Sequence, residues 1–192
     1  MNRAVNDSLA VDLSEFSVEL SPSTSNRSME AEPTLKPRER AYYEFVRAWL
    51  ETLLKPKTST LHLEVTADRQ FSNTLQAQID QHREIIFSFL RDARPDITGF
   101  LRAKPDSIRE LLVVEVKLTP IKLDDIYQIR KYAELFDASY ALLVTPHEIP
   151  ERIVRLARVV FPLLSLPGYK RVTLARLRED GGNVDWLPED PF

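Results

Sequence analysis

Apolar residues recur at the helical spacing of three or four residues in four stretches of the chain. This spacing predicts amphipathic helices over residues 37–54, 72–92, 122–136 and 150–164. The first stripe consists of Tyr42, Phe45, Val46, Trp49, Leu50, Leu53 and Leu54. The other stripes are led by Leu75 and Ile79, by Ile126, Ile129, Ala133 and Phe136, and by Ile153, Leu156, Ala157, Val160 and Leu164. Each helix is therefore expected to bury one face in a core.

Six shorter segments are apolar runs or alternate between apolar and polar side chains. They predict strands over residues 60–66, 96–102, 110–118, 140–145, 170–178 and 184–186. The loop 102–109 would join two antiparallel strands, whereas strand 140–145 follows a helix and is expected to lie parallel to strand 110–118. Gly181-Gly182-Asn183 predicts the turn of a C-terminal hairpin. Together the elements predict an α/β fold.

Length and composition are ordinary for one globular domain, with 192 residues, 43% apolar and 29% charged. We expect this domain to occupy residues 34–192. Residues 1–33 are acidic and rich in serine, which predicts a disordered tail. Within that tail Leu9, Val11 and Leu13 alternate with polar residues, so a short strand or a segment that docks a protein partner is the alternative to a solvated tail.

Several classes of protein are excluded by composition. The chain has no cysteine, so disulfides, thiolate zinc sites and iron–sulfur clusters are excluded. It has no apolar run of about 18 residues, which predicts no membrane-spanning helix. The N-terminal segment lacks the basic region and apolar stretch of a secretory signal. We therefore expect a cytoplasmic protein that does not interact with membranes.

The net charge of −3 hides an uneven distribution of charge along the chain. Residues 1–33 carry two basic and six acidic side chains, and residues 179–192 carry five acidic side chains and no basic ones. Residues 150–178 carry seven basic side chains and one acidic side chain. Because contacts with phosphates need a local basic patch and not a basic whole chain, this distribution is compatible with nucleic-acid binding.

Three charged residues stand at the ends of two predicted neighbouring strands. Glu115 and Lys117 project from the same face of strand 110–118, about 7 Å apart, and Asp96 begins the preceding strand. Two carboxylates about 4 Å apart repel each other by about 4 kcal/mol at an effective dielectric of about 20. Either one of them stays protonated or a cation lies between them. An all-oxygen pair open to water suits Mg²⁺ or Mn²⁺.

The order Pro95-Asp96 followed by Glu115-Val116-Lys117 resembles the motif of the PD-(D/E)XK nuclease superfamily, whose members share the restriction-endonuclease-like fold. Glu44 on the preceding helix and Gln128-x-x-x-Tyr132 on the following helix add to the resemblance. The second of these elements is similar to one in RecB-like branches of the superfamily, and the chain as a whole resembles either a RecB-like or a Holliday-junction-resolvase-like branch. The resemblance covers about residues 38–146.

The resemblance implies an αβββαβ core with an inserted helix, extended over residues 150–192 by a C-terminal helix and a hairpin. It also implies a magnesium-dependent hydrolysis of phosphodiester bonds, most often those of DNA. In that interpretation Asp96 and Glu115 bind one or two Mg²⁺ or Mn²⁺ ions with the carbonyl of Val116. Glu44 supplies an outer ligand.

The resemblance gives the remaining motif residues roles in the reaction itself. Lys117 would orient the attacking water or offset the charge that develops on the phosphate. Gln128 and Tyr132 would align the scissile phosphate. Ordinary polar residues on a helix surface are the alternative for Gln128 and Tyr132, as a solvated surface residue is for Glu44.

Other basic side chains are candidates for contacts with nucleic-acid phosphates. They are Arg102, Lys104 and Arg109 in the loop 102–109, Lys122, Arg130 and Lys131 in helix 122–136, and Arg152, Arg155 and Arg158 in helix 150–164. The loop residues fit a solvated hairpin end equally well. The last three repeat at a spacing of three residues, which fits either a stripe that follows phosphates or a solvated helix face.

Two alternatives to a nuclease remain open from the sequence. One is an inactive nucleic-acid-binding or protein-assembly module with the same fold, which the low net charge favours and the complete Asp96, Glu115 and Lys117 set disfavours. The other is a structural α/β protein in which Glu115 and Lys117 only pair with their neighbours. The sequence does not distinguish DNA from RNA, or endonuclease from exonuclease. A homodimer is the usual arrangement for a small nuclease that cuts both strands.

Overall fold

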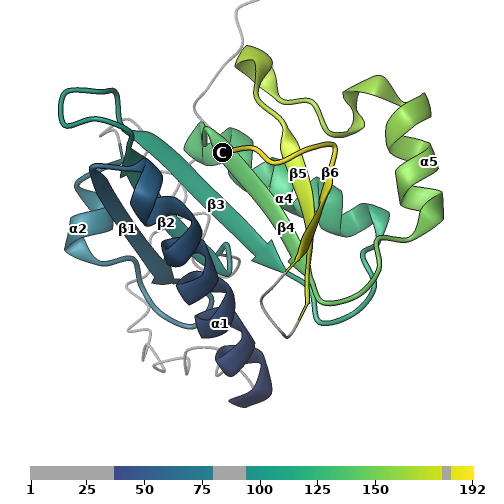
Figure 1. The fold of residues 1–192 in the computed structure, drawn as a ribbon, viewed down its shortest axis with the longest axis horizontal. Helices are drawn as coiled ribbons and strands as arrows, with labels where there is room; N and C mark the ends of the chain where they lie inside the picture. The colour runs from purple at the N-terminus through teal and green to yellow at the C-terminus, as the bar shows by residue number, and fades with distance from the viewer. Residues whose placement is uncertain (1–36, 80–93, 179–182) are drawn as a thin grey trace, which may run out of the picture. The chain divides into compact units, whose positions relative to one another are not determined.

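The computed structural model describes residues 37–79, 94–178 and 183–192, and in this part of the chain six strands form one mixed sheet (Figure 1). The strands are β1 (Thr60–Val65), β2 (Ile97–Arg102), β3 (Glu110–Val116), β4 (Tyr140–Thr145), β5 (Val172–Leu177) and β6 (Val184–Leu187). The α-helices are α1 (Pro37–Leu54), α2 (Asn73–Gln76), α4 (Leu123–Phe136) and α5 (Glu151–Val159). The predicted α/β class, a mixed sheet flanked by helices, is confirmed. The predicted tail 1–33 lies outside the described residues.

The strands follow one another across the sheet in chain order, from β1 to β6. β1, β2 and β3 pair antiparallel, β4 lies parallel to β3 after the α4 crossover, and β5 lies parallel to β4. These directions confirm the predicted loop between β2 and β3 and the predicted parallel β4. β6 returns antiparallel to β5, as the predicted C-terminal hairpin requires, although Gly181 and Gly182 of its turn lie outside the described residues. The hairpin widens the main sheet.

Two apolar cores lie on opposite faces of the sheet. One contains α1, through Val46, Leu50 and Leu54, together with residues of β1 to β5. The other contains residues of α4, of α5 and of the 3₁₀ turn Phe161–Leu163. Burial of apolar surface on both faces of the sheet stabilises this three-layer arrangement, by about 25 cal/mol for each Å² that is removed from water.

The central strand β3 explains the unbroken apolar run in its sequence. Leu112, Val114 and Val116 pack in the core that contains α1, while Leu111 and Val113 pack in the core that contains α4. A strand with helices on both faces is apolar at every position. Glu115 continues the α4 side of this alternation, so its carboxylate is directed into an otherwise apolar layer.

The helix predicted over residues 72–92 is confirmed in its described part only over Asn73–Gln76. The structure has one helical turn, α2, and the backbone turns away after Gln76. Leu75 and Ile79 are buried as their spacing suggested, Leu75 within α2 and Ile79 in the turn that follows it. Apolar spacing reports burial, and over so few residues it does not separate a helix from a folded loop. Residues 80–92 of the predicted helix lie outside the described residues.

The helix predicted over residues 150–164 is too long. α5 ends at Val159, and Phe161–Leu163 form a 3₁₀ turn. Pro162 has no N–H to continue the helix, and it disfavours a helical conformation at the residue before it. Val160 is 39% exposed, so its predicted inward position is wrong, whereas Leu163 and Leu164 are buried.

Gly99 in β2 is the position where the sheet tolerates no side chain. A Cβ added there would lie 2.2 Å from the backbone oxygen of His62 and 2.5 Å from the Leu63 Cδ2 atom on β1. The Gly99→Ala change is expected to lower the free energy of unfolding by about 1–3 kcal/mol, because the β1 backbone must move. Chemical denaturation would measure this, and an unchanged midpoint would contradict the close packing of β1 on β2.

No helix among the residues that the structure describes is long and apolar enough to span a membrane.

Candidate functional site

Asp96 is held at the sheet end where β2 begins and β3 ends. Its side chain is 8% exposed, and its Oδ2 accepts a hydrogen bond of 2.7 Å from the backbone N–H of Val116. Its own backbone oxygen accepts from the N–H groups of Thr66 and Ala67. Asp96 is therefore fixed by both neighbouring strands, β1 and β3, and its second carboxylate oxygen is left for other partners.

Lys117 links β3 to α4. Its Nζ lies 3.0 Å from the Glu115 Oε1 and 3.0 Å from the Gln128 Oε1. The Asp125 Oδ1 in the first turn of α4 lies 3.6 Å from the same nitrogen. The structure thus brings together the predicted residues Asp96, Glu115, Lys117 and Gln128 at one end of the sheet. Side chains from two strands and one helix converge there.

Glu115 is a buried carboxylate with one unpaired oxygen. The residue is 3% exposed, and its Oε2 has no hydrogen-bond partner. Burial, followed by the nearby Asp96 carboxylate, raises the pKa of Glu115 above its ordinary value, although Lys117 acts in the opposite direction. An ionised carboxylate oxygen left without a partner in such a place costs free energy until a proton or a cation binds it.

Asp96 and Lys117 respond to the same environment. Burial raises the pKa of Asp96, and it outweighs the N–H of Val116 and the charge of Lys117, which lower that pKa. Burial by itself lowers the pKa of Lys117, but the carboxylate of Glu115 reverses this, so the pKa is raised and the ammonium stays charged. The site therefore combines two carboxyl groups that resist ionisation with one fixed cation.

Two α1 residues that sequence reasoning missed face this site. The Tyr43 hydroxyl is hydrogen-bonded to the Asp96 carboxylate, and Glu39 adds negative charge near both groups. Burial is the main reason that the pKa of Tyr43 is raised, so this hydroxyl remains a donor. Glu39 and Tyr43 are four residues apart, which places them on one helix face. That spacing, combined with the expected direction of α1, could have identified them.

Removing the Tyr43 hydroxyl is expected to raise the pKa of Asp96 further. A hydrogen bond to a charged group contributes about 1.5–3 kcal/mol, and its loss disfavours the carboxylate form of Asp96. Carboxyl NMR titration of Tyr43→Phe would measure the change. Tyr42→Phe is the matched control, because the Tyr42 hydroxyl donates to the Leu177 oxygen, 3.1 Å away. Equal Asp96 titrations in the two variants would contradict this role of Tyr43.

Tyr132 lies one turn beyond Gln128 on α4 and is completely buried. Its hydroxyl makes no hydrogen bond within normal limits. Burial raises the pKa of Tyr132, and the neighbouring Gln128 side chain opposes that effect. Tyr132 therefore packs in the α4 core behind Gln128. Gln128 contacts Lys117 directly, while Tyr132 supports Gln128 from the interior.

Glu44 does not lie with the other carboxylates. Its Oε2 accepts from the Arg47 Nε at 2.8 Å, and the side chain is 42% exposed. Glu44 lines a different hollow, together with Arg47, Glu64 and Ser72. The structure therefore does not bring the predicted outer ligand Glu44 to Asp96 and Glu115, because a helical stripe does not show which polar residue beside it faces a partner. Glu39, another acidic residue of α1, does act on Asp96, because its charge raises the pKa of the Asp96 carboxyl group.

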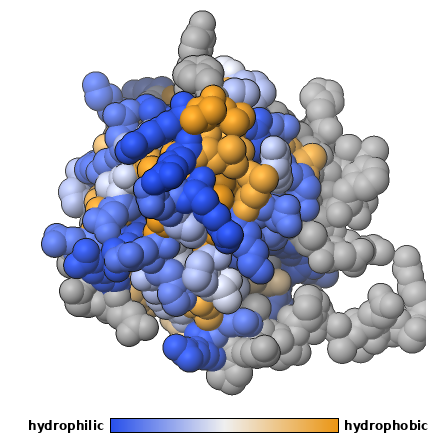
Figure 2. Space-filling model, turned by 90° about the vertical axis from the view of Figure 1, so that its right-hand side faces the viewer, coloured by the Kyte–Doolittle hydropathy of each residue, from blue (hydrophilic) through white to orange (hydrophobic). Residues whose placement is uncertain are grey.

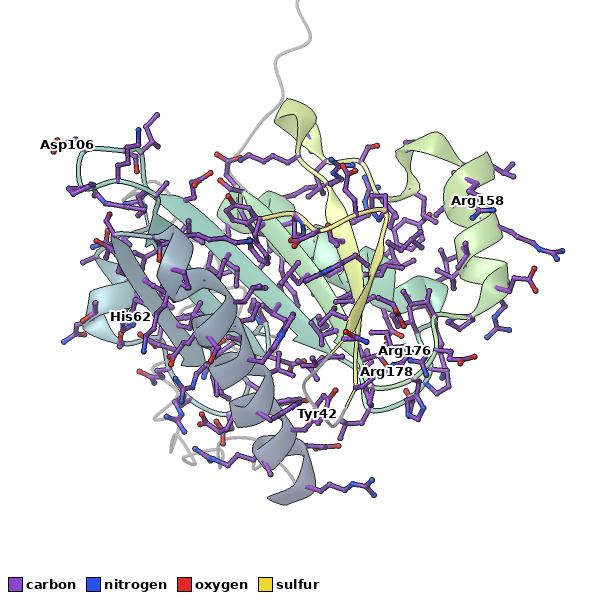
Figure 3. The ribbon with its side chains drawn as sticks, in the orientation of Figure 1. Tyr42, His62, Asp106, Arg158, Arg176 and Arg178 are labelled. Atoms are coloured by element: carbon purple, nitrogen blue, oxygen red, sulfur yellow. The ribbon has the colours of Figure 1, made fainter. Side chains whose placement is uncertain are left out.

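The predicted phosphate contacts in the loop between β2 and β3 lie at the wrong end of the sheet. Asp96 precedes β2 and Arg102 ends it, so the six-residue strand separates them by about 20 Å. Figure 3 shows Asp106 of this loop far from Tyr42, which lies near the other end of the strands. Lys104 is exposed, and Arg102 approaches carbonyl oxygens of the loop itself, at 3.4 and 3.5 Å. Arg102, Lys104 and Arg109 therefore do not join the site.

The basic residues of α4 divide into two kinds. Arg130 donates to the backbone oxygens of Pro162 and Leu163, so it stabilises the 3₁₀ turn after α5 and is not available for phosphates. Lys131 is exposed and lies 4.6 Å from the centre of the Tyr132 ring. Lys122 is exposed at the start of α4, the end of the helix closest to Lys117. Of the three, Lys122 is the best placed for a phosphate.

The arginines of α5 form a separate surface. Arg155 is paired with Glu151 on the same helix, and Arg152 and Arg158 are exposed. Figure 3 places Arg158 well away from Tyr42, Arg176 and Arg178. Figure 2 faces the α5 side and shows an apolar patch next to hydrophilic surface. Val159 of α5 is exposed. This surface does not border the buried carboxylates.

Asp96 and Glu115 are the groups able to hold a metal ion at this end of the sheet. Within the described ranges no three His, Cys, Asp or Glu side chains gather in a group that would hold one by themselves. Mg²⁺ needs only one or two carboxylates, since it keeps several waters. The unpaired Glu115 Oε2 fits such an ion, whereas it does not fit a closed, fully protein-ligated site.

Comparisons of the chain with protein-family models, curated proteins and solved structures found no match.

Proposed function

We propose that this chain is a metal-dependent nuclease with a restriction-endonuclease-like fold, related to the PD-(D/E)XK superfamily. The observation that carries the proposal is the buried Glu115 Oε2, left without a partner beside Asp96 and Lys117. In a buried ion pair with a purely structural role, both carboxylate oxygens are in most cases hydrogen-bonded. An orphaned oxygen next to a second carboxylate supports a site that is completed by a cation.

Asp96, Glu115 and the carbonyl of Val116 would hold Mg²⁺ or Mn²⁺. When bound, the ion would act as a Lewis acid toward a phosphate oxygen and make a water a better nucleophile at neutral pH. The backbone N–H of Val116 and the Tyr43 hydroxyl orient Asp96 for this task. Glu39 takes the outer position that the sequence had suggested for Glu44.

Lys117 would position the attacking water or stabilise the charge that develops on the phosphate. Its ammonium is held by Glu115, Gln128 and Asp125, so it is oriented before a substrate arrives. Preoriented charge of this kind stabilises a transition state more effectively than mobile charge. Gln128 acts as a positioning residue for Lys117, and Asp125 adds a carboxylate that the sequence motif did not include.

A cleavage panel tests the proposal. Single-stranded, double-stranded and branched DNA, and RNA, would be incubated with Mg²⁺, Mn²⁺ or EDTA, with Asp96→Asn as the inactive comparison. The expected result is cleavage that needs the metal and is lost in Asp96→Asn. No cleavage of any substrate, combined with salt-sensitive binding to nucleic acid, would replace the nuclease by a binding module of the same fold.

A further inference from the structure

A cavity of about 680 Å³ is lined in part by Glu39, and apart from this residue the reaction proposed above does not use it. It is lined by Arg38, Glu39, Ala41, Tyr42, Phe45, Leu118, Pro146 and His147. These residues come from the first turns of α1 and from the segments that follow β3 and β4. The volume is in the range of about 300–1,000 Å³ that is typical of sites for small organic groups.

The cavity and the carboxylate site share a wall. Leu118 follows Lys117 directly, and neighbouring residues of an extended segment point in opposite directions. Glu39 lines the cavity and also adds negative charge at Asp96. The His147 Nε2 lies 2.8 Å from the backbone oxygen of Leu118, which accepts the hydrogen bond, and this contact holds the two loops together. The cavity and the Lys117 side chain therefore lie on the two sides of the segment that follows β3, so a nucleotide in the cavity would be the neighbour of the one whose phosphate reaches Lys117.

The chemistry of the lining matches a nucleobase. Tyr42 and Phe45 provide two aromatic rings whose centres are 5.7 Å apart, and such rings stack on bases of any sequence. Leu118 and Pro146 add apolar surface. The Glu39 carboxylate at the edge can accept from the amino group of a base. Arg38 and the exposed His147 can approach the phosphates on either side.

We propose that this cavity receives one unstacked nucleobase, and that the substrate is therefore single-stranded nucleic acid. The inference rests on the nuclease proposed above and specifies its substrate class. In a duplex the bases are stacked and paired inside the helix, so none reaches a cavity on the α1 side without being extruded. Arg178 lies at the same end of the sheet as Tyr42 and is exposed, which places a further cation along the path of the strand (Figure 3).

Binding measured in EDTA tests the cavity without relying on cleavage. The probes are fluorescein-labelled strands of about twelve nucleotides: single-stranded DNA, the same sequence as RNA, the duplex, and a single strand with an abasic backbone that keeps every phosphate. Loss of base stacking is expected to weaken binding about tenfold or more, and the duplex is expected to bind as weakly as the abasic strand. Comparison of the affinities for the DNA strand and the RNA strand shows whether deoxyribose or ribose is preferred.

Two variants assign that preference to the cavity. Ala41→Leu fills part of the cavity from an exposed helix position, and Tyr42→Leu removes a stacking ring; both should bring the intact strand to the affinity of the abasic strand. Ala48→Leu on the same helix, outside the cavity, and Tyr42→Phe, which keeps the ring, should preserve the preference. Circular dichroism would establish that each variant is folded.

The outcomes separate this inference from the nuclease itself. Equal binding of intact and abasic strands, or an unchanged preference in Ala41→Leu, overturns the base site even if metal-dependent cleavage is observed. Base-dependent binding that disappears in Ala41→Leu, in a protein that cleaves nothing, supports the cavity and overturns the nuclease.

Discussion

The Lys117→Ala variant is expected to cleave nucleic acid about 10²–10³-fold more slowly than the unaltered chain. Removing one preoriented group that stabilises developing charge typically has an effect of this size. Lys117 is held by contacts to Glu115 and Gln128, so its truncation removes a fixed cation from the site of the carboxylates. Single-turnover cleavage at saturating Mg²⁺ would measure the change in the chemical step.

Two further variants make this prediction specific. Lys117→Met keeps the length and the apolar stem of the side chain, so it should reproduce the loss of cleavage if the packing around Glu115 is preserved. Lys104→Ala removes an exposed lysine at the opposite end of the sheet and should cleave normally. Normal cleavage by folded Lys117→Met would show that the ammonium has no part in the reaction.

Magnesium is expected to stabilise the fold, and to do so more strongly as the pH rises. The pKa of Glu115 is raised in the folded protein, mainly by burial and then by Asp96. The stability that this group contributes is therefore complete below the pKa of the unfolded chain and is lost as the pH rises through the raised pKa. Without metal, unfolding should become easier as the pH rises from the ordinary pKa of a glutamate, 4.5, to the raised pKa of Glu115, about 8.

Mg²⁺ binds the ionised carboxylates, so it opposes this loss. At about 100 times its dissociation constant it should add about 2.7 kcal/mol to the free energy of unfolding. Thermal unfolding across the pH range, with Mg²⁺ or EDTA, would measure the effect. A pH-independent response to Mg²⁺ would contradict binding at Asp96 and Glu115.

Glu115→Gln is the decisive variant for this prediction. The neutral amide fills the same space without a buried charge, so at alkaline pH the metal-free variant should unfold at a higher temperature than the unaltered protein. It should also lose the response to Mg²⁺. Glu110→Gln, at the other end of the same strand and half-buried, is the control. It should resemble the unaltered protein both in its unfolding temperature at alkaline pH and in its response to Mg²⁺.

Local sequence determined the elements and most of the sheet. The apolar run at residues 110–118 predicted the strand β3, and the helix predicted between β3 and β4 predicted their parallel pairing. Period-two spacing placed Glu115 and Lys117 on one face, and their contact of 3.0 Å follows from it. These properties depend on residues that are close together in the chain, so the spacing of apolar and polar residues along the sequence predicts them.

The failures have a common physical cause. Leu75 and Ile79 are buried without continuing a helix, because burial depends on the surrounding core and not only on local spacing. Arg102 and Lys104 follow Asp96 closely in sequence, yet the length of β2 carries them to the far end of the sheet. Residues at opposite ends of one extended strand are far apart in space although they are close in sequence. A list of charged residues that are close in sequence does not show this separation.

The sequence by itself determined which residues carry the candidate chemistry: Asp96, Glu115, Lys117 and Gln128. Only the tertiary structure decided that Glu39 and Tyr43, and not Glu44, face Asp96, because the rotation of α1 against the sheet is set by packing of its whole apolar stripe. The tertiary structure alone also left the Glu115 Oε2 without a partner. Charge type is a local property, whereas burial and pairing are properties of the assembled layers.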